Sequence, residues 1–99
     1  MRVVLDTNVV ASALLWGGTP ERLIEAAGEG TLELFTSEAL LAELAGILGR
    51  AKFSVLACAL AARVDAIVTG DADLHAFGNY QGISVLSPAQ TLQRIAVGS

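Results

Sequence analysis

Val3-Val4-Leu5-Asp6-Thr7-Asn8 is the stretch that decides the fold, because an apolar run ends abruptly there in a carboxylate, a hydroxyl and an amide. A short β-branched run stopped by polar residues predicts a buried parallel strand that delivers its last residues to the carboxyl edge of a sheet. Open α/β sheets place their chemistry at that edge. This stretch alone leaves open the simpler alternative that Asp6 or Asn8 only caps the following helix.

A second apolar stretch ends in the same way. Ala66-Ile67-Val68-Thr69-Gly70-Asp71-Ala72-Asp73 also passes from apolar residues to a hydroxyl and then to two acids. Two strands that both end in acids favour one shared acidic site over two independent helix caps. Asp6 and Asp71 are therefore expected on neighbouring strands, at the same edge of the sheet.

The remaining chain alternates between helix and strand patterns, which predicts a parallel sheet with right-handed crossovers. Periodicity and start signals predict helices over residues 9–15, 20–27, 38–48, 55–63 and 88–96. Further strands are expected over residues 32–36 and 83–86, with a loop over 78–82. The expected caps are Thr19 for the second helix, Thr36 or Ser37 for the third and Ser87 for the last.

The composition fits one small domain with a single core. The chain has 99 residues, of which 54% are hydrophobic, and this apolar excess suggests a homodimer. No apolar run approaches the roughly 20 residues of a membrane-spanning helix. The first residues lack the apolar region of a signal peptide, so a cytoplasmic location is expected. Cys58 lies in an apolar stretch without a second cysteine and is expected in the core.

The charge balance indicates an acidic cluster. The net charge of −4 comes from 10 acids against 6 Lys and Arg, which argues against the basic surface usual in nucleic-acid-binding proteins. Removing Asp6, Glu43, Asp71 and Asp73 from the 10 acids leaves 6, equal to the 6 basic residues. The acidic excess has the size of one proposed cluster, which metal ions would neutralise.

Several motifs together resemble the PIN-domain family, and within it the toxin components of bacterial toxin–antitoxin systems. The resemblance rests on Val4-Leu5-Asp6-Thr7-Asn8, Ser37-Glu38 with Glu43-Leu44, Leu56-Ala57-Cys58-Ala59, Val68-Thr69-Gly70-Asp71-Ala72-Asp73-Leu74 and Ser87-Pro88. These motifs follow the family's order over nearly the whole chain. The resemblance implies a three-layer α/β/α fold and a Mg²⁺- or Mn²⁺-dependent endoribonuclease, with RNA as substrate and a protein antitoxin as partner.

The implied chemistry explains why acids would be gathered in this way. Phosphodiester hydrolysis needs an activated water and a stabilised leaving oxygen, which one or two divalent ions about 4 Å apart can provide. Carboxylate oxygens suit Mg²⁺ and Mn²⁺. Under the resemblance, Asp6 and Asp71 are inner ligands, Glu43 supplies the opposite wall, and Asp73 binds a second metal or orients water. Supporting hydrogen bonds are expected from Thr7, Asn8 and Thr69.

Other interpretations of single residues stay open. Glu43 as a solvated helix residue and Asp73 as a helix cap are the alternatives to metal ligation. His75 has no Cys or second His at metal-binding spacing and is expected at the surface. Trp16 and Tyr80 are candidates for stacking on bases, although packing or partner binding is the preferred interpretation. The candidates for phosphate contacts, which a dimer would pool, are Arg22, Arg50, Lys52 and Arg63.

The chain departs from the family around Phe53. Toxins of this type carry, after the third helix, a further helical segment, an edge strand and an acidic turn that supplies a third carboxylate. Here Phe53 is followed directly by Ser54, and no acid lies between Glu43 and Asp65. Residues 49–54 would have to return the chain to the carboxyl edge of the sheet by themselves, and fully extended they span only about 20 Å.

This taut connection predicts a segment absent between Phe53 and Ser54. A continuous chain would instead favour the rival interpretation, a catalytically degenerate PIN scaffold that dimerises or binds an antitoxin.

Overall fold

The computed structural model describes residues 1–44 and 52–98, without the side chains of residues 43–44, 52–54 and 98. Within these residues, five strands form one sheet in the order β2-β1-β3-β5-β4. The strands are β1 (Arg2–Leu5), β2 (Glu33–Phe35), β3 (Ala66–Val68), β4 (Asn79–Tyr80) and β5 (Ile83–Leu86). All neighbouring pairs are parallel except β4 and β5, which are antiparallel.

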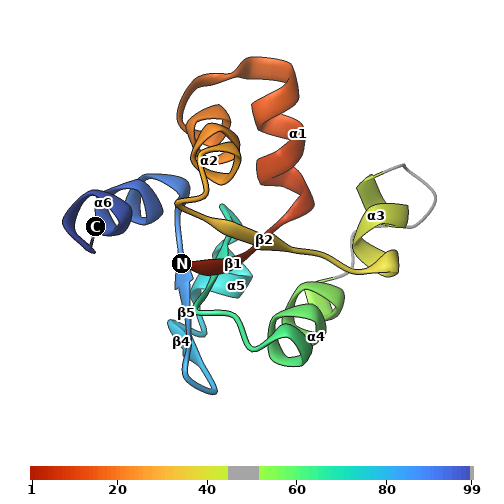
Figure 1. Cartoon of the computed structure of the whole chain (residues 1–99). Helices are drawn as coiled ribbons and strands as arrows, with labels where there is room; N and C mark the ends of the chain where they lie inside the picture. The colour runs from red at the N-terminus through yellow and green to blue at the C-terminus, as the bar shows by residue number, and fades with distance from the viewer. Residues whose placement is uncertain (45–51, 99) are drawn as a thin grey trace.

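Helices cover both faces of the sheet (Figure 1). One face carries α1 (Thr7–Trp16), α2 (Gly18–Gly28) and α6 (Pro88–Gly98). The opposite face carries α3 (Glu38–Leu44), α4 (Lys52–Ala62) and α5 (Ala72–His75). This arrangement confirms the predicted three-layer α/β/α fold with a mostly parallel sheet. In the described part of the chain, no helix is long and apolar enough to span a membrane.

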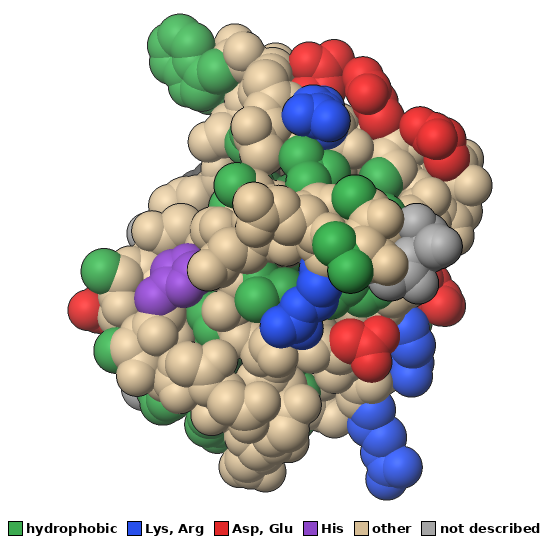
Figure 2. Space-filling model, turned by 90° about the vertical axis from the view of Figure 1, so that its left-hand side faces the viewer, with side chains coloured by type: hydrophobic (Ala, Val, Ile, Leu, Met, Phe, Trp, Pro, Cys, Tyr) green, Lys and Arg blue, Asp and Glu red, His purple; other side chains and the backbone are tan. Residues whose placement is uncertain are grey.

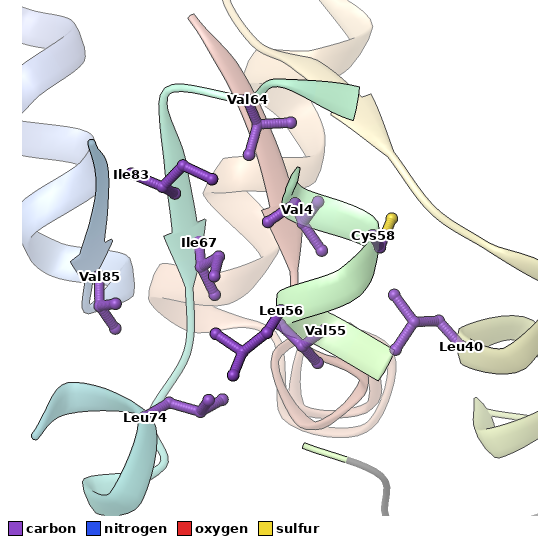
Figure 3. Close-up of a cluster of buried hydrophobic side chains, with 11 residues drawn as sticks. Val4, Leu40, Val55, Leu56, Cys58, Val64, Ile67, Leu74, Ile83 and Val85 are labelled. Carbon is purple, nitrogen blue, oxygen red and sulfur yellow. The ribbon is translucent and has the colours of Figure 1, made fainter. Parts of the chain in front are cut away.

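Alternation along the strands creates two separate cores. Val4 and Ile67 pack under α4 in the cluster shown in Figure 3, whereas Val3 and Val68 pack on the other face. Both faces of β1 and β3 are therefore buried, as is usual for parallel strands. Cys58 belongs to the α4 core as predicted, and its burial raises the pKa of its thiol.

Of the predicted caps of the second, third and last helices, the structure confirms two and contradicts one. The Ser37 hydroxyl accepts from Leu40 N at 3.2 Å, which confirms it as the cap of α3. Ser87 and Gln90 exchange two hydrogen bonds as a capping box at α6. The prediction of Thr19 as a cap is wrong: α2 begins at Gly18 after Gly17, whose φ of 68° suits glycine.

The predicted loop over residues 78–82 contains a short strand. Asn79 and Tyr80 form β4 and pair with Ser84 and Ile83 of β5. Gln81 and Gly82, with φ of 49° and 86°, make the tight turn between the two strands. Asn79 and Tyr80 form a strand because they pair with β5, and two residues are too few to show the alternation that predicts a strand.

Helix α4 passes through Phe53 and Ser54 without a break. The prediction of a segment absent between these two residues stays a prediction. Residues 52–54 are helical, so the extended conformation predicted for residues 49–54 is wrong for these three. Residues 49–51 lie outside the described part of the chain. Among the described strands none lies beyond β2, so the family's extra edge strand has no counterpart there.

The side chain of Arg2 ties the start of β1 to the end of α4. Its guanidinium donates to Ala62 O at 2.6 Å and to Arg63 O at 3.3 Å, and it lies 4.7 Å from the centre of the Phe35 ring. Carbonyls at a helix end have no partner within the helix and carry the negative end of its dipole. A cation there satisfies both the hydrogen bonds and the charge.

Substitution Arg2→Met is expected to lower the free energy of unfolding by about 1 kcal/mol. This value is smaller than that of a buried charged hydrogen bond, because the Arg2 side chain is exposed and solvent screens its charge. Urea denaturation measures this difference. Arg22→Met, at an exposed position of α2, is the control and should change stability by less than about 0.5 kcal/mol. Equal losses in the two variants would contradict the role given to Arg2.

Candidate functional site

The two acidic strand ends lie side by side. In the β1–β3 register Leu5 pairs with Val68, so the next residues, Asp6 and Thr69, emerge together at the carboxyl edge. Asp6 N donates to Val68 O at 2.9 Å, and Thr69 N donates to Leu86 O of β5 at 2.9 Å. The backbone positions of both residues are thus fixed by the sheet.

The hydroxyl of Thr69 connects the two acidic segments. It donates to Asp6 Oδ2 at 2.6 Å and accepts from Asp71 N at 3.0 Å. Thr69 and Asp6 are 0% and 1% exposed, so this contact is shielded from water. A charge-assisted hydrogen bond of this length holds the Asp6 carboxylate in one orientation.

The other oxygen of Asp6 caps helix α1. Asp6 Oδ1 accepts from Asn8 N at 3.3 Å and, over a longer 3.4 Å, from the Thr7 hydroxyl. The capping alternative raised by the sequence is therefore correct, but it accounts for only one of the two carboxylate oxygens. Capping and site formation are compatible for this side chain.

Asp71 and Asp73 follow at the same edge, at the start of α5. Asp71 is partly exposed, and its Oδ1 accepts from Asp73 N at 2.8 Å. Asp71 is thus the cap of α5, and the alternative that Asp73 caps this helix is wrong. Asp73 is exposed in the first turn. The predicted placement of Asp6 and Asp71 on neighbouring strands at one edge agrees with the structure.

Glu43 belongs to α3, which begins at the same edge because it follows the parallel strand β2. Its side chain lies outside the description, so its role as the opposite wall stays a prediction. Among the described side chains, no group of three or more His, Cys, Asp or Glu is arranged to hold a metal ion.

The carboxylate oxygens of Asp6 and Asp71 are of the kind that suits one hard cation. Mg²⁺ commonly takes one or two carboxylates and completes its coordination with water. A zinc site built from several thiol and imidazole ligands has no counterpart among the described residues, which hold no group of three or more such side chains.

Two hollows are lined in part by residues of α1. A mostly apolar hollow of about 230 Å³ lies between α1, β2 and α3, and Thr7 contributes to its wall. A smaller one of about 140 Å³ is lined by Asn8, Val9, Ser12, Pro20, Gly70 and Pro88. Asn8 thus supports Asp6 through its backbone N–H, while its side chain is exposed beside the smaller hollow.

His75 is expected at the surface, and its side chain is indeed partly exposed, but it also makes a contact that the sequence did not predict. Its Nε2 lies 2.6 Å from the carbonyl oxygen of Thr69, the residue whose hydroxyl donates to Asp6. The sequence carried no signal for this contact with Thr69, only for a helix face shared with Asp71. His75 follows Asp71 by one helical turn, and residues four apart lie on the same helix face.

The aromatic candidates lie away from this edge, while Arg50 and the side chain of Lys52 lie outside the described part of the chain. Tyr80 packs edge-on against Phe77, with ring centres 5.3 Å apart, as the packing interpretation predicted. Trp16 is 83% exposed at the far end of α1. On the face drawn in Figure 2, basic side chains are scattered among acidic and apolar ones and form no continuous basic surface.

These observations define a three-layer α/β/α protein with buried and exposed acids at the carboxyl edge of its sheet. The sequence profile described as "PIN domain" matches residues 2–55. This match covers more than half of the 99 residues, and the chain therefore belongs to the PIN domain family. The match includes Asp6 and ends before Asp71. No curated protein and no solved structure matches the chain significantly.

The hydroxyl of Thr69 is open to a direct test. Thr69→Val keeps the shape but removes the donor to a buried carboxylate, and is expected to lower the free energy of unfolding by about 2 kcal/mol. Thr69→Ser keeps the hydroxyl, loses one methyl group and should cost only about 1 kcal/mol. Urea denaturation without divalent ions compares the two. Greater stability of the valine variant would show that the hydroxyl contributes nothing.

Proposed function

We propose that this protein is a metal-dependent endoribonuclease that hydrolyses RNA phosphodiester bonds. PIN domains are in general nucleases that use divalent ions and bind RNA, which supports the proposal at the level of the family. The observation that carries it is the buried Asp6 carboxylate, tied through the Thr69 hydroxyl to the segment of Asp71. A second acid beside a buried carboxylate is costly without a cation.

In this proposal, Asp6 and Asp71 hold the first metal ion, Glu43 closes the opposite wall, and Asp73 holds a second ion or orients water. When bound, Mg²⁺ or Mn²⁺ would supply the charge that activates water and stabilises the leaving oxygen. Thr69 fixes one oxygen of Asp6, and the backbone of Asn8 fixes the other. This leaves the carboxylate little rotational freedom to lose when the ion binds.

We further propose that the protein acts as the toxin of a toxin–antitoxin pair, with a protein antitoxin and a second copy of itself as partners. The support is the resemblance of its motifs to such toxins and the exposure of large apolar side chains. Leu14, Leu15 and Trp16 at the end of α1 are 77%, 72% and 83% exposed. Exposed apolar residues that adjoin one another are typical of protein-binding surfaces.

A second candidate function is a catalytically degenerate PIN scaffold that only binds an antitoxin or dimerises. Two observations favour it: the given sequence holds no acid between Glu43 and Asp65 to form the family's acidic turn, and no three-acid group is found among the described side chains. Metal binding and RNA cleavage separate the two candidates.

Mn²⁺ is expected to raise the melting temperature, because an ion that binds only the native site stabilises the protein by mass action. At a free Mn²⁺ concentration about 100 times its Kd, the gain is about 2.7 kcal/mol. Differential scanning calorimetry should show that Asp71→Asn abolishes most of this shift. Asp65→Asn, in the turn before the same strand β3 but at its other end, should retain it. A shift of unchanged size in Asp71→Asn would contradict the proposed site.

Cleavage of RNA separates a nuclease from a binding scaffold. In Mn²⁺ the wild type is expected to cut a mixed-sequence RNA, whereas Asp6→Asn should be at least about 100-fold slower, since removal of a group that stabilises the transition state commonly costs that much. Gel analysis of labelled RNA provides the measurement. If the wild type binds Mn²⁺ and does not cut RNA, the degenerate-scaffold function is the correct one.

A further inference from the structure

We propose that His75 is a positioning residue for the acidic site, acting through the backbone of Thr69. This inference rests on the proposed function for its metal readout, but its geometric part stands on the hydrogen bonds alone. His75 Nε2 lies 2.6 Å from Thr69 O. The orientation of the Asp6 and Asp71 side chains can depend on the imidazole without a direct contact between them and the ring.

The contacts of Thr69 show how the effect is transmitted. Its N–H donates to Leu86 O of β5, and its carbonyl faces the imidazole of His75 on α5. The residue is therefore held from the strand on one side and from the helix on the other. Its hydroxyl, between these two anchors, contacts both Asp6 Oδ2 and Asp71 N.

Removing the anchor on α5 would free the Thr69–Gly70 peptide to rotate. Rotation there moves Asp71 directly, because Asp71 follows Gly70, and it weakens the bond from Thr69 to Asp6. Gly70 has no side chain to restrict this movement, and an added Cβ at Gly70 would meet nothing within 4 Å. His75 supplies a restraint that the local backbone lacks.

The contact also fixes which imidazole nitrogen carries a proton. A backbone carbonyl only accepts hydrogen bonds, so Nε2 must be the donor. In the neutral ring this leaves Nδ1 without a proton. His75 is the one histidine of the sequence, so its ring signals need no assignment in a tag-free protein.

The first test is a long-range ¹H–¹⁵N NMR correlation of the tag-free protein at about pH 8.5, where an ordinary imidazole is neutral. The inference predicts the Nε2–H tautomer. A ring protonated at Nδ1 would overturn it, because such a ring cannot donate to Thr69 O.

The second test compares His75→Leu with His75→Gln, whose amide retains a donor. Hydrogen exchange of the Asp71 amide, measured without metal, should be faster in the leucine variant and closer to wild type in the glutamine variant. The Ile67 amide in the central strand β3 reports any general loss of stability. Unchanged Asp71 exchange in His75→Leu would overturn the inference whatever the protein does with metal or RNA.

The third test is Mn²⁺ affinity, measured by calorimetric titration. His75→Leu is expected to bind Mn²⁺ about 10-fold more weakly, the usual effect of removing a group that orients a ligand, with substantial recovery in His75→Gln. Gln93→Leu on the exposed face of α6 is the matched control and should bind as wild type. In a Thr69→Val background, the further effect of His75→Leu should be smaller than in the wild type, because part of that effect is transmitted through the Thr69 hydroxyl.

These readouts separate the inference from the proposed function. If Asp6→Asn binds Mn²⁺ as well as wild type, the proposed metal site fails, while the tautomer and the Asp71 exchange still decide the role of His75. If Asp6→Asn loses Mn²⁺ binding but His75→Leu keeps full affinity, the metal site stands and the positioning role is refuted.

Discussion

The structure depends on the parallel register of β1 and β3, in which Leu5 pairs with Val68. This register buries alternate side chains of both strands in the two cores, Val4 and Ile67 on one face and Val3 on the other. It also brings Asp6 to the Thr69 hydroxyl, 2.6 Å away, at the carboxyl edge. A slip of one residue would invert every side chain of a strand, so the same constraint that stabilises the core also forms the site.

The sequence predicted most of this arrangement because its signals are local. Apolar runs that end in acids identified the central strands and the shared edge of Asp6 and Asp71, and Ser37 and Ser87 were recognisable as caps. The remainder depends on pairings that the residue types involved do not signal. Strand β4 exists only because β5 pairs with it, and the imidazole of His75 reaches a carbonyl six residues earlier across a turn.

The departure from the family is confined to one side of the sheet. Strand β2 is its edge, with Leu34 40% exposed and a hollow of about 230 Å³ beside it. Helix α4 begins by Lys52, so the chain reaches the buried helix without the acidic turn found in family toxins. The side formed by β1, β3 and α5 brings Asp6, Thr69 and Asp71 together through hydrogen bonds, and the role of Glu43 in the proposed site is a question for experiment.

The central claim is that the ends of β1 and β3 form one cation site. Paramagnetic broadening of amide signals by substoichiometric Mn²⁺ tests it most directly, because the effect falls steeply with distance from the ion. The account predicts that Asn8, Gly70 and Asp71 broaden first, while Asp65 and Gly82 stay sharp. Broadening centred instead on the exposed acids of α2, Glu21 and Glu25, with the signals of Asn8 and Asp71 unaffected, would contradict it.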